Sequence, residues 1–156
     1  KYSWVDIGSS YLPAELNAAY LWAQFELAQE INNDRLHAWN IYNEGLKELR
    51  DNGKIELPYI PDGCCHNAHM YYLLVADLET RSKLIAHLRR DEILAVFHYV
   101  PLHSAPAGKK YGRQSNGLPV TSELSERLVR LPLWLGLEEN GDQEQVIESV
   151  LRFFAA

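Results

Sequence analysis

The run His69-Met70-Tyr71-Tyr72-Leu73-Leu74-Val75 is short, uninterrupted and apolar, with aromatic and β-branched side chains. Such a run is typical of a buried strand. The amphipathic segment 79–90 follows it and predicts a helix. Further along, the pattern predicts strands at 93–99 and 129–134 and helices at 121–130 and 142–154. Alternating strands and helices predict an α/β (α+β) domain, with a small mixed or antiparallel sheet that carries helices on one face.

A long helical pattern precedes the first strand. Apolar residues recur every three or four positions from residue 13 to residue 52, which predicts one long helix. The polar stretch Asn32-Asn33-Asp34 interrupts the pattern, and we expect the helix to bend or break there. Gly53 suits the left-handed residue that commonly follows a helix end.

The composition restricts the partners of the protein. The 156 residues include 15 Lys and Arg against 21 Asp and Glu, a net charge of −6. Binding to nucleic acid or to an anionic membrane needs clustered cations, so we expect neither partner. The sequence contains no apolar run of roughly 20 residues and no signal-peptide pattern, which favours a cytoplasmic protein. It starts without Met at Lys1, and we expect it to be a piece of a longer protein.

Two cysteines and two histidines lie close together in the sequence. Cys64, Cys65, His66 and His69 are residue types that bind zinc. The two cysteines are adjacent and lack the two-residue gap that lets both sulfurs reach one metal. We therefore predict free thiols and no metal site, with zinc as the weaker alternative, and we expect His69 to form a structural hydrogen bond.

Two other segments carry candidate binding groups. His98-Tyr99-Val100-Pro101-Leu102-His103 ends a predicted strand and enters the longest irregular stretch, residues 101–120. Its imidazoles and phenol suit a hydroxyl-rich or phosphorylated ligand, and an ordinary strand exit is the alternative. Gly8-Ser9-Ser10-Tyr11 precedes the long helix, where it forms either an anion site or a simple N-cap. Residues 108–112 lack the Gly-Lys-Ser/Thr ending of a phosphate loop and predict a solvated loop.

Four sequence blocks, at residues 6–24, 67–72, 98–103 and 125–133, occur in the order seen in one enzyme family. They resemble the C-terminal part of the DegT/DnrJ/EryC nucleotide-sugar aminotransferases. The resemblance implies a pyridoxal phosphate (PLP) enzyme of the aspartate-aminotransferase fold. Its reaction would transfer an amino group from glutamate to the 4-keto carbon of a dTDP-4-keto-6-deoxyhexose, in surface polysaccharide biosynthesis.

The resemblance also implies an organisation for the chain. Residues 1–52 would form an interdomain segment and long connecting helix, and residues 53–156 the C-terminal small domain. The parent protein would be a homodimer. The family's Schiff-base lysine lies upstream of the first block, so this chain would hold no catalytic residue and would be inactive alone. PLP would be held mainly by the missing N-terminal domain.

The family motifs assign roles to five residues. The motif Gly-aromatic-Asn-aromatic-Arg falls on residues 8–12, where Ser10 replaces the Asn that touches the cofactor phosphate in the partner subunit and Ser9 replaces the aromatic. Both serines are therefore candidate cofactor-binding residues. The resemblance makes His98, Tyr99 and His103 candidate substrate-binding residues. Every lysine lies among polar neighbours, unlike an activated lysine, so a non-catalytic binding or dimerisation module of the same fold is the alternative.

Overall fold

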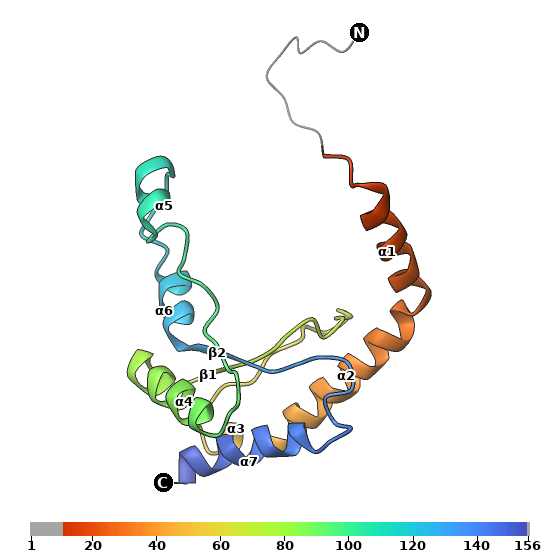
Figure 1. Cartoon of the computed structure of the whole chain (residues 1–156). Helices are drawn as coiled ribbons and strands as arrows, with labels where there is room; N and C mark the ends of the chain where they lie inside the picture. The colour runs from red at the N-terminus through yellow and green to blue at the C-terminus, as the bar shows by residue number, and fades with distance from the viewer. Residues whose placement is uncertain (1–10, 156) are drawn as a thin grey trace.

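Three consecutive helices form the N-terminal part of the computed structural model, which describes residues 11–155. They are α1 (Glu15–Glu26), α2 (Ala28–Gly45) and α3 (Lys47–Asp51) (Figure 1). The region was predicted as one helix, and the structure divides it at Leu27 and Leu46. The predicted break at residues 32–34 is wrong, because these residues lie inside α2.

Tertiary hydrogen bonds explain why the polar stretch stays helical. Asp34 Oδ2 accepts a hydrogen bond from the backbone N–H of Gly136 at 3.1 Å. The next residue, Arg35, donates to the carbonyl oxygens of Ala68 at 3.0 Å and His69 at 2.6 Å. These side chains bond to the rest of the domain and so do not compete for the backbone of their own helix.

The sheet is small and antiparallel. Strand β1 (Tyr71–Leu74) pairs with β2 (Leu128–Leu131), with Tyr71 opposite Leu131. Isolated bridges extend it on both sides, from Glu56 to Leu74 and from Val96 to Arg130. Burial alternates along both strands, so one face of the sheet is buried and the other is half open.

Helices cover the buried face of the sheet. Helix α4 (Leu78–Arg90) begins at Asp77, whose side chain accepts a hydrogen bond from the backbone N–H of Thr80 at 2.7 Å. Helix α7 (Asp142–Ala155) packs against both α4 and α2. The core draws on all of these elements; its fully buried members include Tyr42, Tyr71, Leu73, Leu84, Leu88, Val129 and Val150. The predicted α/β architecture is confirmed.

Three local predictions were wrong. In place of the strand predicted at residues 93–99, the structure has a single bridge at Val96, after which the chain leaves the sheet. The stretch 101–120 is not wholly irregular, since it contains α5 (Pro106–Tyr111) and the start of α6 (Pro119–Arg127). Residues 108–112, predicted as a solvated loop, lie largely in α5, where Pro106 fits the first helical turn.

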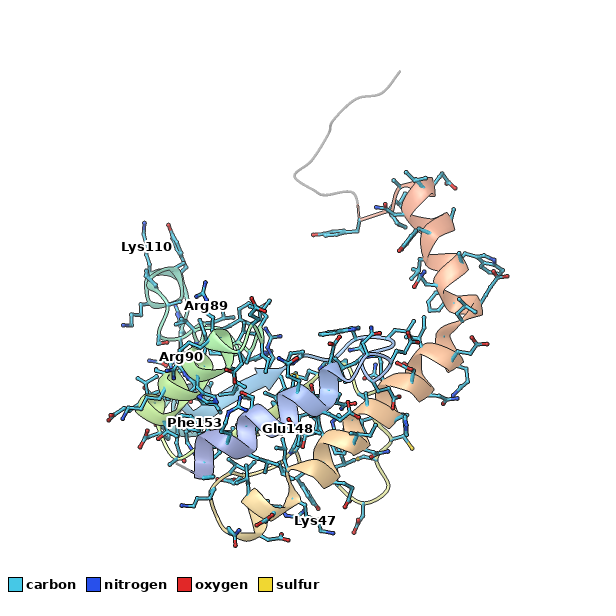
Figure 2. All side chains as sticks on the ribbon, turned by 60° about the horizontal axis from the view of Figure 1, so that its bottom comes forward. Lys47, Arg89, Arg90, Lys110, Glu148 and Phe153 are labelled. Carbon is cyan, nitrogen blue, oxygen red and sulfur yellow. The ribbon has the colours of Figure 1, made fainter. Side chains whose placement is uncertain are left out.

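Two helical arms project to the same side of the domain (Figure 1). Helix α1 forms one arm, and α5 with α6 forms the other. Helix α1 buries no residue; its exposed apolar side chains include Leu16, Tyr20, Trp22 and Phe25. Figure 2 shows side chains on all sides of α1, which stands apart from the rest of the domain, and Lys110 at the far end of α5. None of the helices within residues 11–155 is long and apolar enough to span a membrane.

Candidate functional site

The candidate segment leaves the sheet directly after Val96. Val96 and Arg130 exchange two backbone hydrogen bonds, of 3.1 and 2.7 Å, which fix the start of the segment. Tyr99 then adopts a φ of +55°, a left-handed conformation that is uncommon for an aromatic residue. Such strain persists only where the surrounding structure holds it, and it is concentrated at functional sites. After Tyr99, the residues Val100–Leu102 lie beside α6 and share a pocket with it.

His98 and Tyr99 line a common pocket of about 500 Å³. Their rings contact edge to face with centroids 5.2 Å apart. The remaining wall comes from Val100–Leu102 and from residues of α6, and it is mostly apolar. The Nδ1 atom of His98 is buried and has no hydrogen-bond partner within residues 11–155. A buried polar atom without a partner is costly, so this nitrogen needs a hydrogen-bond partner that residues 11–155 do not supply.

His103 lines a neighbouring pocket of about 560 Å³. Two cations, Lys109 and Arg113, lie on its wall, and no carboxylate does. Leu102 and Thr121 line both pockets, which places the two side by side. The structure therefore brings His98 and Tyr99 into one pocket and places His103 in the next.

A hydrogen bond fixes the ring of His103. Its Nε2 lies 3.1 Å from Ser122 Oγ, and that hydroxyl donates its proton to the carbonyl oxygen of Leu118 at 3.2 Å. A serine hydroxyl has one proton to donate, so Nε2 of His103 is the donor in the first bond. In the neutral ring Nδ1 is then the hydrogen-bond acceptor, which suits a hydroxyl group of a ligand.

Gly108 is required for the wall of the His103 pocket. A Cβ atom at this position would lie 1.5 Å from the carbonyl oxygen of Leu102. Only glycine allows α5 to approach the backbone of residue 102 so closely. The sequence interpretation missed this role, although the Gly108–Gly112 spacing is visible in the sequence.

The remaining candidates are outside the site or outside the described structure. Ser9 and Ser10 lie outside the described residues. Cys64 and Cys65 are exposed free thiols, and residues 11–155 contain no group of three or more His, Cys, Asp or Glu able to hold a metal ion. His69 was expected to form a structural hydrogen bond; its backbone carbonyl accepts one from Arg35, and its side chain is exposed.

Solved structures that share this fold include several described as aminotransferases, among them TlmJ from Streptoalloteichus hindustanus, with a TM-score of 0.74 and 25% identity over 85% of this chain and 34% of TlmJ. DesV from S. venezuelae, solved in complex with a ketimine intermediate, matches with a TM-score of 0.79 and 26% identity over 89% of this chain and 36% of DesV. NtdA from Bacillus subtilis, solved with bound cofactor PMP, shares the fold with a TM-score of 0.67 and 23% identity over 81% of this chain and 29% of NtdA.

The sequence defines the family. A model of the DegT/DnrJ/EryC1/StrS aminotransferase family matches residues 1–151, and the chain belongs to this family. It is 33% identical over 111 residues to a dTDP-3-amino-3,4,6-trideoxy-alpha-D-glucose transaminase from Micromonospora megalomicea subsp. nigra. That alignment covers 70% of the chain and 29% of the relative, so the chain spans about a third of the length of the proteins it matches.

The described lysines do not suit covalent attachment of PLP. A lysine that forms a Schiff base must lose its proton readily, which requires a desolvated or cationic setting. The lysines at 47, 54, 83, 109 and 110 are all exposed. The hydrogen bond to Glu79 raises the pKa of Lys83, the opposite of what the chemistry needs. Within residues 11–155 no lysine therefore fits this role.

Proposed function

We propose that this chain is the C-terminal part of a PLP-dependent sugar-nucleotide transaminase that moves an amino group from glutamate to a dTDP-4-keto-6-deoxyhexose. Residues 1–52 would form the interdomain segment and connecting helix, and residues 53–156 the small domain. The family supports the reaction class. The dTDP-sugar transaminase from Micromonospora supports the substrate class.

The basic pocket at His103 is the observation that carries the substrate proposal. A dTDP-sugar has a diphosphate that needs cations and a sugar that needs hydrogen-bond partners. Lys109 and Arg113 supply positive charge on a wall that has no carboxylate, and Nδ1 of His103 supplies an acceptor. The diphosphate would lie in this pocket. The sugar would then extend toward His98 and Tyr99 in the adjoining, more apolar pocket.

PLP would supply the chemistry by withdrawing electrons from the carbon that gains or loses the amino group. It would be held mainly by an N-terminal domain that precedes this chain and carries the Schiff-base lysine. Ser9 and Ser10 would contact the cofactor phosphate of the partner subunit in a homodimer. The apolar side chains exposed on α1 provide a surface suited to such packing.

The four resembling blocks favour dTDP-4-amino-4,6-dideoxygalactose transaminase, which serves enterobacterial common antigen synthesis, as the particular enzyme. The proposal includes a cytoplasmic location, where sugar nucleotides are made. The second candidate function is a non-catalytic binding or dimerisation module. It is favoured by one observation: no lysine within residues 11–155 fits the Schiff-base role.

One experiment separates the two functions. The longer protein that carries this chain and the 156-residue chain alone are incubated with PLP, reduced with borohydride and mapped by peptide mass spectrometry. We expect one phosphopyridoxyl-lysine, upstream of Lys1, in the longer protein and none in the chain alone. Absence of any labelled lysine in the longer protein would favour the binding module.

A further inference from the structure

A third pocket, of about 270 Å³, lies where α4 packs against α6. It adjoins the His98 pocket, with which it shares Tyr99 and Val100. Its wall carries two opposite charges, Arg81 from α4 and Glu126 from α6. Neither side chain forms an ion pair, with the other or with any charged group within residues 11–155. The pocket therefore presents both signs of charge to its occupant.

The guanidinium of Arg81 is held in place without using all of its donors. Its central carbon lies 5.3 Å from the ring centroid of Phe97, and its Nη1 donates to the carbonyl oxygen of Ser125 at 2.6 Å. Its Nε is buried and has no hydrogen-bond partner within residues 11–155. Arg127, by contrast, has two carboxylate partners. Buried polar atoms are normally satisfied, so the unused donor of Arg81 needs an explanation.

The serine hydroxyls on the wall of this pocket are hydrogen-bond acceptors toward a ligand. Ser104 donates its proton to the carbonyl oxygen of Pro101 at 3.0 Å, and Ser125 donates its proton to that of Ser122 at 2.8 Å. A hydroxyl has one proton to donate, so both oxygens can only accept a further hydrogen bond. Together with the carboxylate of Glu126 they suit an ammonium group, which has three N–H donors.

The remaining wall of the pocket is apolar and limits the size of the ligand. It is formed by Leu78, Phe97, Val100 and Pro101, with the ring of Tyr99. The volume equals that of about nine water molecules, room for a molecule of about nine non-hydrogen atoms, the size of leucine. Apolar walls with a few placed polar groups are typical of small-molecule sites.

We propose that the pocket between α4 and α6 binds a small α-amino acid with an apolar side chain, of about the size of leucine. The carboxylate of the amino acid pairs with Arg81, whose planar guanidinium suits that group. Its ammonium pairs with Glu126 and bonds to the hydroxyl oxygens of Ser104 and Ser125. A zwitterion satisfies both unpaired charges at once, whereas a simple anion or a simple cation satisfies one. The inference concerns binding and does not depend on the proposed sugar-nucleotide substrate.

Calorimetric titration of the protein that carries this chain tests the charge requirement with three probes. They are L-leucine, L-leucinamide, which lacks the carboxylate, and 4-methylpentanoate, which lacks the ammonium group. We expect L-leucine to bind saturably and each analogue to bind at least about tenfold more weakly, because each leaves one charge of the pocket unpaired. Absence of saturable leucine binding, or equal affinity for leucine and either analogue, would overturn the proposal.

Two variants assign the binding to this pocket. We expect R81M to weaken leucine binding by about tenfold or more and to leave leucinamide binding unchanged. E126Q has the reciprocal effect: leucine binds more weakly, and 4-methylpentanoate binds as before. The matched controls R90M and E148Q remove exposed charges from α4 and α7 (Figure 2).

Glu126 keeps the proposal testable if R81M does not fold, because its side chain is exposed and its replacement leaves the packing intact. In E126Q we expect leucine to bind no more tightly than 4-methylpentanoate. Unchanged leucine affinity in E126Q would place the bound amino acid elsewhere and overturn the assignment.

Discussion

Ser149 on α7 donates a hydrogen bond of 2.5 Å to the carboxylate of Asp91, the residue that ends α4. Arg152 donates to the same oxygen at 2.5 Å, and His87 lies 3.6 Å from it. One carboxylate thus joins the C-terminal end of α4 to α7. These hydrogen bonds, that of Ser149 first and that of Arg152 second, hold the pKa of Asp91 below its ordinary value.

The Asp91 contact predicts a pH-dependent stability. A lowered pKa in the folded state means that the unfolded chain binds the proton more readily. The stabilisation is therefore complete above the unfolded pKa of about 4 and is lost as the pH falls through the folded value. We expect D91N to lower the Tm at neutral pH and to flatten the acid side of the Tm profile. The control is E92Q at the exposed neighbour; if both variants behave alike, the contact has no such role.

Two stacked tyrosines predict opposite effects of the same substitution. Tyr42 and Tyr71 are fully buried with ring centroids 4.9 Å apart, and burial raises the pKa of both phenols. Tyr42 donates a hydrogen bond of 2.9 Å to the carbonyl oxygen of Pro132, whereas the Tyr71 hydroxyl has no partner within residues 11–155.

We expect Y42F to lower the free energy of unfolding by about 1 kcal/mol, because it removes the hydrogen bond to the part-buried carbonyl of Pro132. Y71F removes an unsatisfied hydroxyl, and we expect it to be neutral or stabilising. Urea denaturation of both variants measures the difference. A larger loss for Y71F than for Y42F would show that the two hydroxyls have the opposite roles.

Gly108 predicts a local effect on the basic pocket. The Cβ of G108A would overlap the carbonyl oxygen of Leu102, so α5 must move. Because α5 buries no residue, we expect the Tm to change little while the affinity for dTDP falls by about tenfold or more. Calorimetric titration with dTDP measures this, with A107S in the same helix as the control. Unchanged affinity would mean that the pocket does not hold the diphosphate.

The assignment of His98 to the sugar pocket predicts a loss of catalytic efficiency in the protein that carries this chain. H98Q removes the unpartnered imidazole from the sugar pocket, and we expect kcat/KM for the dTDP-sugar to fall by about 10- to 100-fold. The control H37Q changes an exposed histidine on α2.

The assignment of Ser10 to the cofactor phosphate predicts a separate effect. We expect S10A to weaken retention of PLP, measured by absorbance after gel filtration. Normal kinetics in H98Q together with normal retention in S10A would remove both assignments.

The fold was predictable where a local pattern and tertiary packing agree. The strand at Tyr71–Leu74 and the helix at Leu78–Arg90 were predicted to within two residues, because the first is an uninterrupted apolar run rich in aromatic residues and the second repeats its apolar side chains with the period of a helix. The continuity of α2 through residues 32–34 was not predictable, since Asp34 and the adjacent Arg35 bond to Gly136, Ala68 and His69, which are distant in sequence.

The candidate site was predictable only in part. The motif identified His98, Tyr99 and His103, and the structure locates them in two adjoining pockets. Gly108 was missed, because its close approach to Leu102 depends on the path of a loop, which the sequence pattern does not reveal.

The central claim is that the protein transfers an amino group from glutamate to a dTDP-sugar, and its most direct test traces the amino nitrogen of glutamate. The protein that carries this chain is incubated with PLP, L-[15N]glutamate and a dTDP-4-keto-6-deoxyhexose, and the sugar product is analysed by mass spectrometry and NMR. The account predicts 15N on C4 of the dTDP-sugar, with one equivalent of 2-oxoglutarate formed. An unlabelled sugar recovered with its 4-keto group intact would contradict it.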